Sequence, residues 1–175
     1  EHNGIRVILP EVKCCGIARI SAGGQDKILD DIYYKIALLS EYTAHGIPIV
    51  FSEPSCALAV KCEYPRIVAS EQARLVADSC YDIHQYLMEM HAHGELKTDF
   101  NRLDMMIGYH VPCHLKTLGV TNEPVELLVR NPVQGGDLGT VPFRQLSRPD
   151  VGVLGQQHQS GHPVAVLTKV LGRIT

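Results

Sequence analysis

The chain has 175 residues, of which 45% are hydrophobic and 20% are charged, and these values are typical of a globular protein with one domain or two small ones. The net charge of −3 does not indicate a nucleic-acid partner, and the absence of any apolar run of about 18 residues argues against a membrane-spanning helix. Six cysteines are too sparse for a disulfide-stapled secreted scaffold. They favour a reducing compartment in which thiols are kept for metal or redox chemistry.

The first third of the chain alternates between strand and helix patterns. Ile5–Leu9 is apolar and β-branched, which predicts a short strand, and Pro10–Gly24 is a predicted loop. Apolar residues then recur every three or four positions over Gln25–His45, which predicts a helix. Ile47–Phe51 is apolar throughout, as in a parallel strand that is covered on both faces.

The same alternation continues further along the chain. Cys56–Tyr64 is a predicted short helix that ends at Pro65, and Ser70–His93 is predicted as one long helix. Met105–Tyr109 is a third predicted strand. Two helical pieces follow, Cys113–Leu118 and Glu123–Arg130. This order predicts an α/β fold, a small parallel sheet with flanking helices.

Four cysteines lie after predicted strands. In α/β sheets, chemistry gathers in the loops beyond the carboxyl ends of the strands. We therefore expect these cysteines to share one site. They are Cys14, Cys15, Cys56 and Cys113.

Cys14-Cys15-Gly16 is the most informative motif among them. Adjacent cysteines rarely bridge to each other, because a disulfide needs a Cα spacing and Cβ directions that neighbours seldom supply. Two neighbouring thiolates suit a soft metal, above all an iron–sulfur cluster, and the glycine lets the backbone approach a bulky inorganic core. The alternative is a pair of small buried hydrophobic side chains at a strand end.

The other cysteines and two histidines have simpler interpretations. Cys62 and Cys80 lie in predicted helices, where packing in the core is the favoured role. His110 and His114 flank Cys113 and suggest zinc, but their spacing around a Pro-Cys turn does not fit a usual zinc pair. A polar loop or a helix N-terminus is the favoured interpretation there.

Three segments together resemble the cysteine-rich CCG domain family of iron–sulfur proteins, which is heterodisulfide reductase B-like. They are Cys14–Ile17, Glu53–Leu58 and Tyr109–His114, and the resemblance covers residues 4–130. Within the family, Glu63-Tyr64-Pro65 is most similar to the branch formed by the C subunits of the anaerobic glycerol-3-phosphate dehydrogenases.

This resemblance implies a function. Its cysteines would hold an iron–sulfur cluster of the 4Fe-4S type, with Cys14, Cys15, Cys56 and Cys113 as cofactor-binding and metal ligands. The chain would be an electron-transfer subunit of an oxidoreductase complex, with no substrate chemistry of its own. It would pass electrons from a flavin-containing dehydrogenase towards the menaquinone pool, as a peripheral protein at the cytoplasmic face of the membrane.

The chain also departs from the family pattern. The family domain is duplicated, and the resemblance implies a first repeat over residues 1–100 without its opening cysteine, so the chain is expected to begin within a repeat. Glu53 stands where the first cysteine of a Cys-x-x-Cys motif is expected. The second repeat, residues 101–130, keeps Cys113 but lacks a second Cys-Cys-Gly. Residues 131–175 are predicted to be a divergent, weakly ordered tail, so the chain resembles a family member that is incomplete at both ends.

Two other functions remain open. The first is a cluster-free α/β remnant that serves as a docking module for the dehydrogenase partner. The second is a mononuclear zinc site built from Cys14, Cys15, Cys56 and a histidine.

Overall fold

The computed structural model describes residues 2–11, 13–99, 109–129 and 166–169 of the chain. In these residues, four short strands form one sheet in the order β1-β4-β2-β3. β2 and β3 are parallel, whereas β4 pairs antiparallel with both β1 and β2. The predicted α/β fold with parallel strands is confirmed. The strands are β1 (Val7–Ile8), β2 (Ile49–Phe51), β3 (Cys80–Asp82) and β4 (Val166–Lys169).

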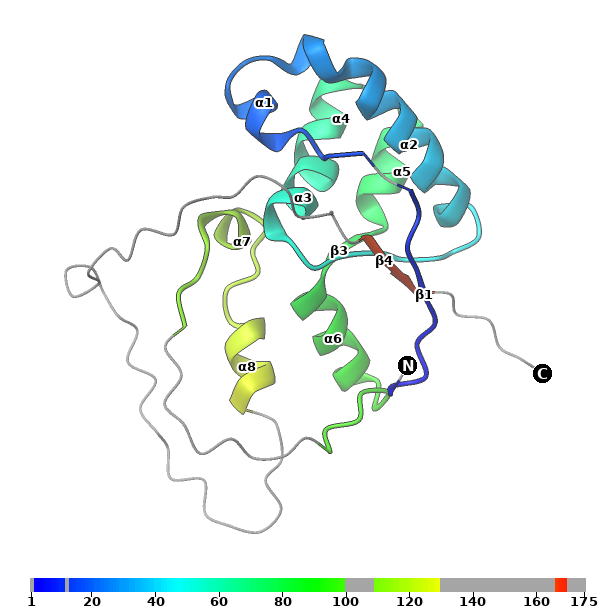
Figure 1. Cartoon of the computed structure of the whole chain (residues 1–175). Helices are drawn as coiled ribbons and strands as arrows, with labels where there is room; N and C mark the ends of the chain where they lie inside the picture. The colour runs from blue at the N-terminus through cyan, green and yellow to red at the C-terminus, as the bar shows by residue number, and fades with distance from the viewer. Residues whose placement is uncertain (1, 12, 100–108, 130–165, 170–175) are drawn as a thin grey trace, which may run out of the picture.

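Helices lie on both sides of this sheet (Figure 1). In the view of Figure 1, α1, α2, α4 and α5 gather above the strands, and α6 and α8 pack against each other below them. The helical segments in chain order are α1 (Ile17–Ser21), the 3-10 helix η1 (Gln25–Ile28), α2 (Leu29–Thr43), α3 (Pro54–Leu58), the π-helix η2 (Ala59–Glu63), α4 (Tyr64–Ile67), α5 (Glu71–Asp78), α6 (Ile83–Ala92), α7 (Cys113–Thr117) and α8 (Glu123–Val129). No helix within the described ranges is long and apolar enough to cross a bilayer.

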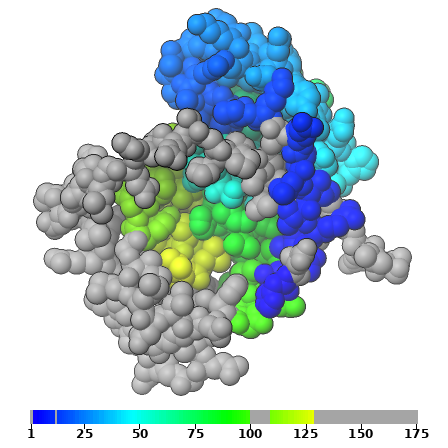
Figure 2. Space-filling view, in the orientation of Figure 1, coloured from blue at the N-terminus to red at the C-terminus, as the bar shows by residue number. Residues whose placement is uncertain are grey.

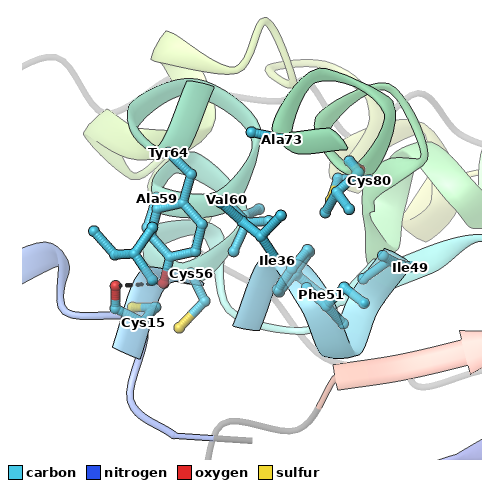
Figure 3. Close-up of a cluster of buried hydrophobic side chains, with 14 of the residues drawn as sticks. Cys15, Ile36, Ile49, Phe51, Cys56, Ala59, Val60, Tyr64, Ala73 and Cys80 are labelled. Carbon is cyan, nitrogen blue, oxygen red and sulfur yellow. Dashed lines mark hydrogen bonds between the residues drawn. The ribbon is translucent and has the colours of Figure 1, made fainter. Parts of the chain in front are cut away.

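The main core lies between α2, β2 and the helical run from α3 to α5 (Figure 3). Its largest fully buried side chains include Tyr64, Phe51 and Leu39. Cys15 and Cys56 lie next to each other at one end of this cluster, as the close-up shows. In the space-filling view, α1 and α2 form the blue lobe at the top of the molecule (Figure 2). One end of the core is therefore lined by thiols.

The prediction of a single long helix over Ser70–His93 is wrong. The structure ends α5 at Asp78 and places Cys80–Asp82 in β3, parallel to β2. The Asp82 carboxylate accepts hydrogen bonds from the His84 backbone N–H at 2.9 Å and from His84 Nδ1 at 2.8 Å, so it begins the new helix α6. An N-cap aspartate satisfies backbone donors that an isolated helix start leaves unpaired. The sequence periodicity ran across two helices and hid this break.

The helix predicted over Cys56–Tyr64 is longer than expected. Helical structure runs from Pro54 to Ile67 through α3, η2 and α4, and Pro65 does not end it. Pro65 lies in the first turn of α4, directly after the irregular turn of η2. Proline is tolerated in a first helical turn because the backbone N–H that it lacks has no helical partner there.

Two further predictions concern loops and strands. The predicted loop Pro10–Gly24 contains the short helix α1. Residues 105–108 of the predicted strand Met105–Tyr109 lie outside the described residues, as does most of the predicted tail. Four residues of that segment, Val166–Lys169, form β4 between β1 and β2.

Candidate functional site

The Cys-Cys-Gly motif forms a tight turn immediately before α1. Gly16 is the N-cap of α1 with φ of 74°, a left-handed conformation that favours glycine. Its backbone N–H donates to Cys14 Sγ at 3.5 Å. A Cβ atom at this position would lie 2.5 Å from Ile28 Cδ1. The backbone conformation therefore favours glycine after the cysteine pair, and any larger residue would also displace the end of the Ile28 side chain.

Cys56 reaches the same place from another element. It lies in α3, which begins shortly after β2 ends at Phe51, with Pro54 in the first turn and Glu53 as the N-cap. The Glu53 carboxylate accepts from the Ser55 backbone N–H at 3.3 Å. Cys56 and Cys15 are each 4% exposed, whereas Cys14 is exposed. The predicted gathering of cysteines at the carboxyl end of the strands thus holds for the Cys14–Cys15 turn and Cys56.

The two buried thiols lie next to each other (Figure 3). Hydrogen bonding to the Cys56 thiol lowers the pKa of Cys15 to about 6, against the opposing effect of burial. The Ile17 backbone N–H and the charge of Lys35 also lower the pKa of Cys15. The same hydrogen bond, together with burial, raises the pKa of Cys56. One thiolate, stabilised by one neighbouring thiol, is the favoured state of this pair near neutral pH.

Sequence reasoning missed Lys35, which is the buried cation of the site. It belongs to α2 and is only 2% exposed. Its ammonium group donates to the Cys14 carbonyl oxygen at 2.6 Å and to Tyr64 Oη at 3.0 Å. Tyr64 Oη in turn donates to the Cys15 carbonyl oxygen at 2.9 Å (Figure 3). The spacing of the predicted helix could have indicated that Lys35 is buried. It lies three residues after the buried Ile32, on the apolar face of that helix.

A second polar network connects the Glu53–Leu58 segment with the Tyr109–His114 segment. His114 Nδ1 lies 2.9 Å from Ser55 Oγ, and Ser55 Oγ donates to Glu53 Oε1 at 2.9 Å. With the Ser55 hydroxyl group donating to Glu53, His114 Nδ1 is assigned as the donor to Ser55. This network ties α7 to α3, and Cys113 is the exposed first residue of α7.

The remaining predicted residues have structural roles or lie at the surface. Cys80 is fully buried, its thiol donates to the Val76 carbonyl oxygen at 3.1 Å, and burial raises its pKa, which confirms the predicted core position. Cys62 is partly buried and His110 is exposed. Glu53, at the position of the expected cysteine, is a helix cap.

The donor atoms gathered at the site are thiol sulfurs. Among the residues that the structure describes, no group of three or more Cys, His, Asp or Glu side chains is arranged to hold a metal ion. A cluster spreads its ligands over several irons and takes thiolates, and the turn at Cys14 and Cys15, together with Cys56, offers thiol sulfur beside a buried cation.

Comparisons with known proteins point to one kind of relative. The chain is 27% identical over 122 residues to the C subunit of anaerobic glycerol-3-phosphate dehydrogenase from Escherichia coli strain K12, and equally similar to that of Escherichia coli O157:H7. In each case the match covers 69% of this chain and 30% of the relative, so the chain spans less than a third of the length of these relatives. No family model matches the chain, and no solved structure matches it significantly. The chain is thus distantly similar to part of one component of an anaerobic dehydrogenase.

Proposed function

We propose that this chain is an iron–sulfur electron-transfer subunit of an oxidoreductase complex. The observation that carries the proposal is the meeting of the Cys14–Cys15 turn and Cys56 beside the buried Lys35, at the end of the core. Thiol groups from separate elements in one partly buried place are the donor set that iron–sulfur clusters require. The distant similarity to the C subunit of an anaerobic dehydrogenase supports the same function.

Cys14, Cys15 and Cys56 are the proposed ligands from the first repeat, and Cys113 on α7 is the proposed fourth. The Ser55–His114 hydrogen bond supports this choice, because it holds α7 against the helix that carries Cys56. When bound, a 4Fe-4S type cluster supplies outer-sphere transfer of one electron at a time. The protein contributes a largely buried pair of thiols, a fixed turn and a neighbouring cation.

The proposed partners follow from the similarity to these dehydrogenase components. We propose that a flavin-containing dehydrogenase of the glycerol-3-phosphate type donates the electrons. The menaquinone pool is the proposed destination, reached through peripheral association with the cytoplasmic face of the membrane. The chain itself then carries out no substrate chemistry.

Metal analysis of the chain purified without oxygen tests this proposal. Iron, acid-labile sulfide, zinc and visible absorbance are measured together on the same sample. About four irons with matching sulfide and a broad visible band are the expected result. Zinc at one ion per chain would favour the zinc alternative. A folded chain with neither metal would favour the cluster-free docking module and contradict the proposal.

A further inference from the structure

The backbone of the cysteine pair is held by two buried side chains from different helices. Lys35 on α2 donates to the carbonyl oxygen of Cys14 at 2.6 Å, and Tyr64 on α4 donates to that of Cys15 at 2.9 Å. Lys35 and Tyr64 also bond each other at 3.0 Å, which closes the arrangement. Both side chains are buried, at 2% and 1% exposure. Two consecutive carbonyls of the turn are thus fixed from inside the protein.

We call this arrangement of Lys35 and Tyr64 the carbonyl clamp. It uses the charged ammonium group of Lys35 where a neutral donor would satisfy the Cys14 carbonyl oxygen. Burying an ammonium group is costly unless an opposite charge or several acceptors accompany it. Among the described residues, the hydrogen bonds of Lys35 go to the Cys14 carbonyl and to Tyr64, and none goes to a carboxylate. The nearby carboxylate of Asp31 is bonded to Lys13 at 2.6 Å instead.

The nearby cysteines favour the charged form of Lys35. Burial lowers the pKa of Lys35, and the charges of Cys15, Cys14 and Cys56 oppose that shift, Cys15 most strongly. A buried cation bonded to the backbone of the cysteine turn stabilises negative charge on whatever the neighbouring sulfurs hold, because the low local dielectric strengthens the interaction.

We propose that Lys35 and Tyr64 are positioning residues for the thiol site. They lock the Cys14–Cys15 turn through its two carbonyls, and Lys35 also supplies a fixed positive charge that favours the more reduced, more negative state of a cluster bound there. The first part concerns the metal-free chain and stands alone, whereas the second part rests on the proposed function.

The chain offers a matched control for this test. Lys61 also donates to a cysteine carbonyl, that of Cys80 at 2.8 Å, and its ammonium group also lies over a tyrosine ring, that of Tyr81. Lys61→Met therefore removes the same kind of contact at a place away from the thiol site. The test variants are Lys35→Met, which removes the charge and both bonds, and Tyr64→Phe, which removes only the hydroxyl group.

Hydrogen exchange of the reduced, metal-free chain tests the clamp. We expect exchange in the peptide covering residues 13–18 to become about tenfold faster in Lys35→Met and in Tyr64→Phe, and to stay unchanged in Lys61→Met. Exchange at β2 is the reference and should not change in either test variant. Unchanged exchange at residues 13–18, or an equal increase at β2 that reveals general loosening, would overturn the positioning role.

The midpoint potential of the iron-loaded chain tests the charge. Lys35→Met is expected to shift this potential to a more negative value, because the reduced state loses its stabilising cation, and Lys61→Met should leave it unchanged. Equal potentials in both variants would overturn the role of the Lys35 charge. If the chain takes up no iron, the proposed function and the charge role fail together, while the exchange measurement still decides the clamp.

Discussion

The Cys56 side chain lies next to that of Cys15, although Cys56 lies in α3 and Cys15 lies in the turn before α1. Figure 3 shows the two side chains together at the end of the core. The neighbouring Cys56 thiol lowers the pKa of Cys15 and so favours its thiolate form in the folded chain only, because unfolding separates the two residues. Stability and protonation of the metal-free chain are therefore linked through this pair.

The first prediction concerns the pH dependence of stability. The pKa of Cys15 falls from the ordinary thiol value of 9.0 to about 6 on folding. The contribution of Cys15 to the free energy of unfolding is therefore absent below pH 6, grows as the pH rises, and is fully present above pH 9. The pKa of Cys56 is raised, so Cys56 removes stability above pH 9. Urea unfolding of the reduced, metal-free chain should show a gain between these limits on the order of 3 kcal/mol.

Two serine variants identify the source of this gain. Cys15→Ser should flatten the rise in the free energy of unfolding between pH 6 and pH 9, and Cys62→Ser should keep it, because Cys62 is not part of the pair. An equal rise in Cys15→Ser would mean that other groups cause the pH dependence.

The second prediction compares two glycines with the same backbone conformation. Gly16 and Gly23 both have φ of 74°, but a Cβ at Gly16 would lie 2.5 Å from Ile28 Cδ1, and one at Gly23 would meet nothing within 4 Å. Gly23→Ala should destabilise the chain by about 1 kcal/mol through backbone strain alone. Gly16→Ala should cost more, about 2 kcal/mol, because the end of the Ile28 side chain must also move out of its place in the core. Equal losses in urea unfolding would show that the packing at Gly16 is not as described.

The third prediction concerns the hydrogen bond between Ser55 and His114, which joins α3 to α7. A double-mutant cycle with Ser55→Ala and His114→Ala should give a coupling energy of about 1 kcal/mol. His110 serves as the control, since it is exposed and belongs to the same segment. Ser55→Ala and His110→Ala should add within about 0.5 kcal/mol. A coupling for His114 no larger than that for His110 would contradict the described contact.

Parts of this fold were predictable because local patterns determine them. The apolar runs Ile5–Leu9 and Ile47–Phe51 correctly predicted β1 and β2, and the helical spacing of apolar residues predicted α2. The approach of Cys56 to the Cys14–Cys15 turn followed from a general rule, since loops after strands that run in the same direction lie at one edge of a sheet. Such features depend on residues that are close in sequence or on sheet geometry.

Other parts depended on contacts that the sequence does not mark. The break between α5 and α6 arises because Cys80–Asp82 pairs with β2, a long-range contact that overrides a helical pattern. Lys35 lies on the apolar face of its helix, but the sequence does not mark its partners, the carbonyl oxygen of Cys14, 21 positions away, and the hydroxyl group of Tyr64. Glu53 stands where the family pattern has a cysteine, and its role as the N-cap of α3 is visible only in the structure.

The most direct test of the proposed cluster compares two cysteines of one helical run. Cys56 lies in the thiol site, whereas Cys62, in η2, lies outside it. After anaerobic reconstitution, the chain and Cys62→Ser should each hold about four irons with matching sulfide, and Cys56→Ser should lose most of both. Equal iron in the two variants, or no iron in a folded unmutated chain, would contradict the claim that the Cys14–Cys15 turn and Cys56 form an iron–sulfur site.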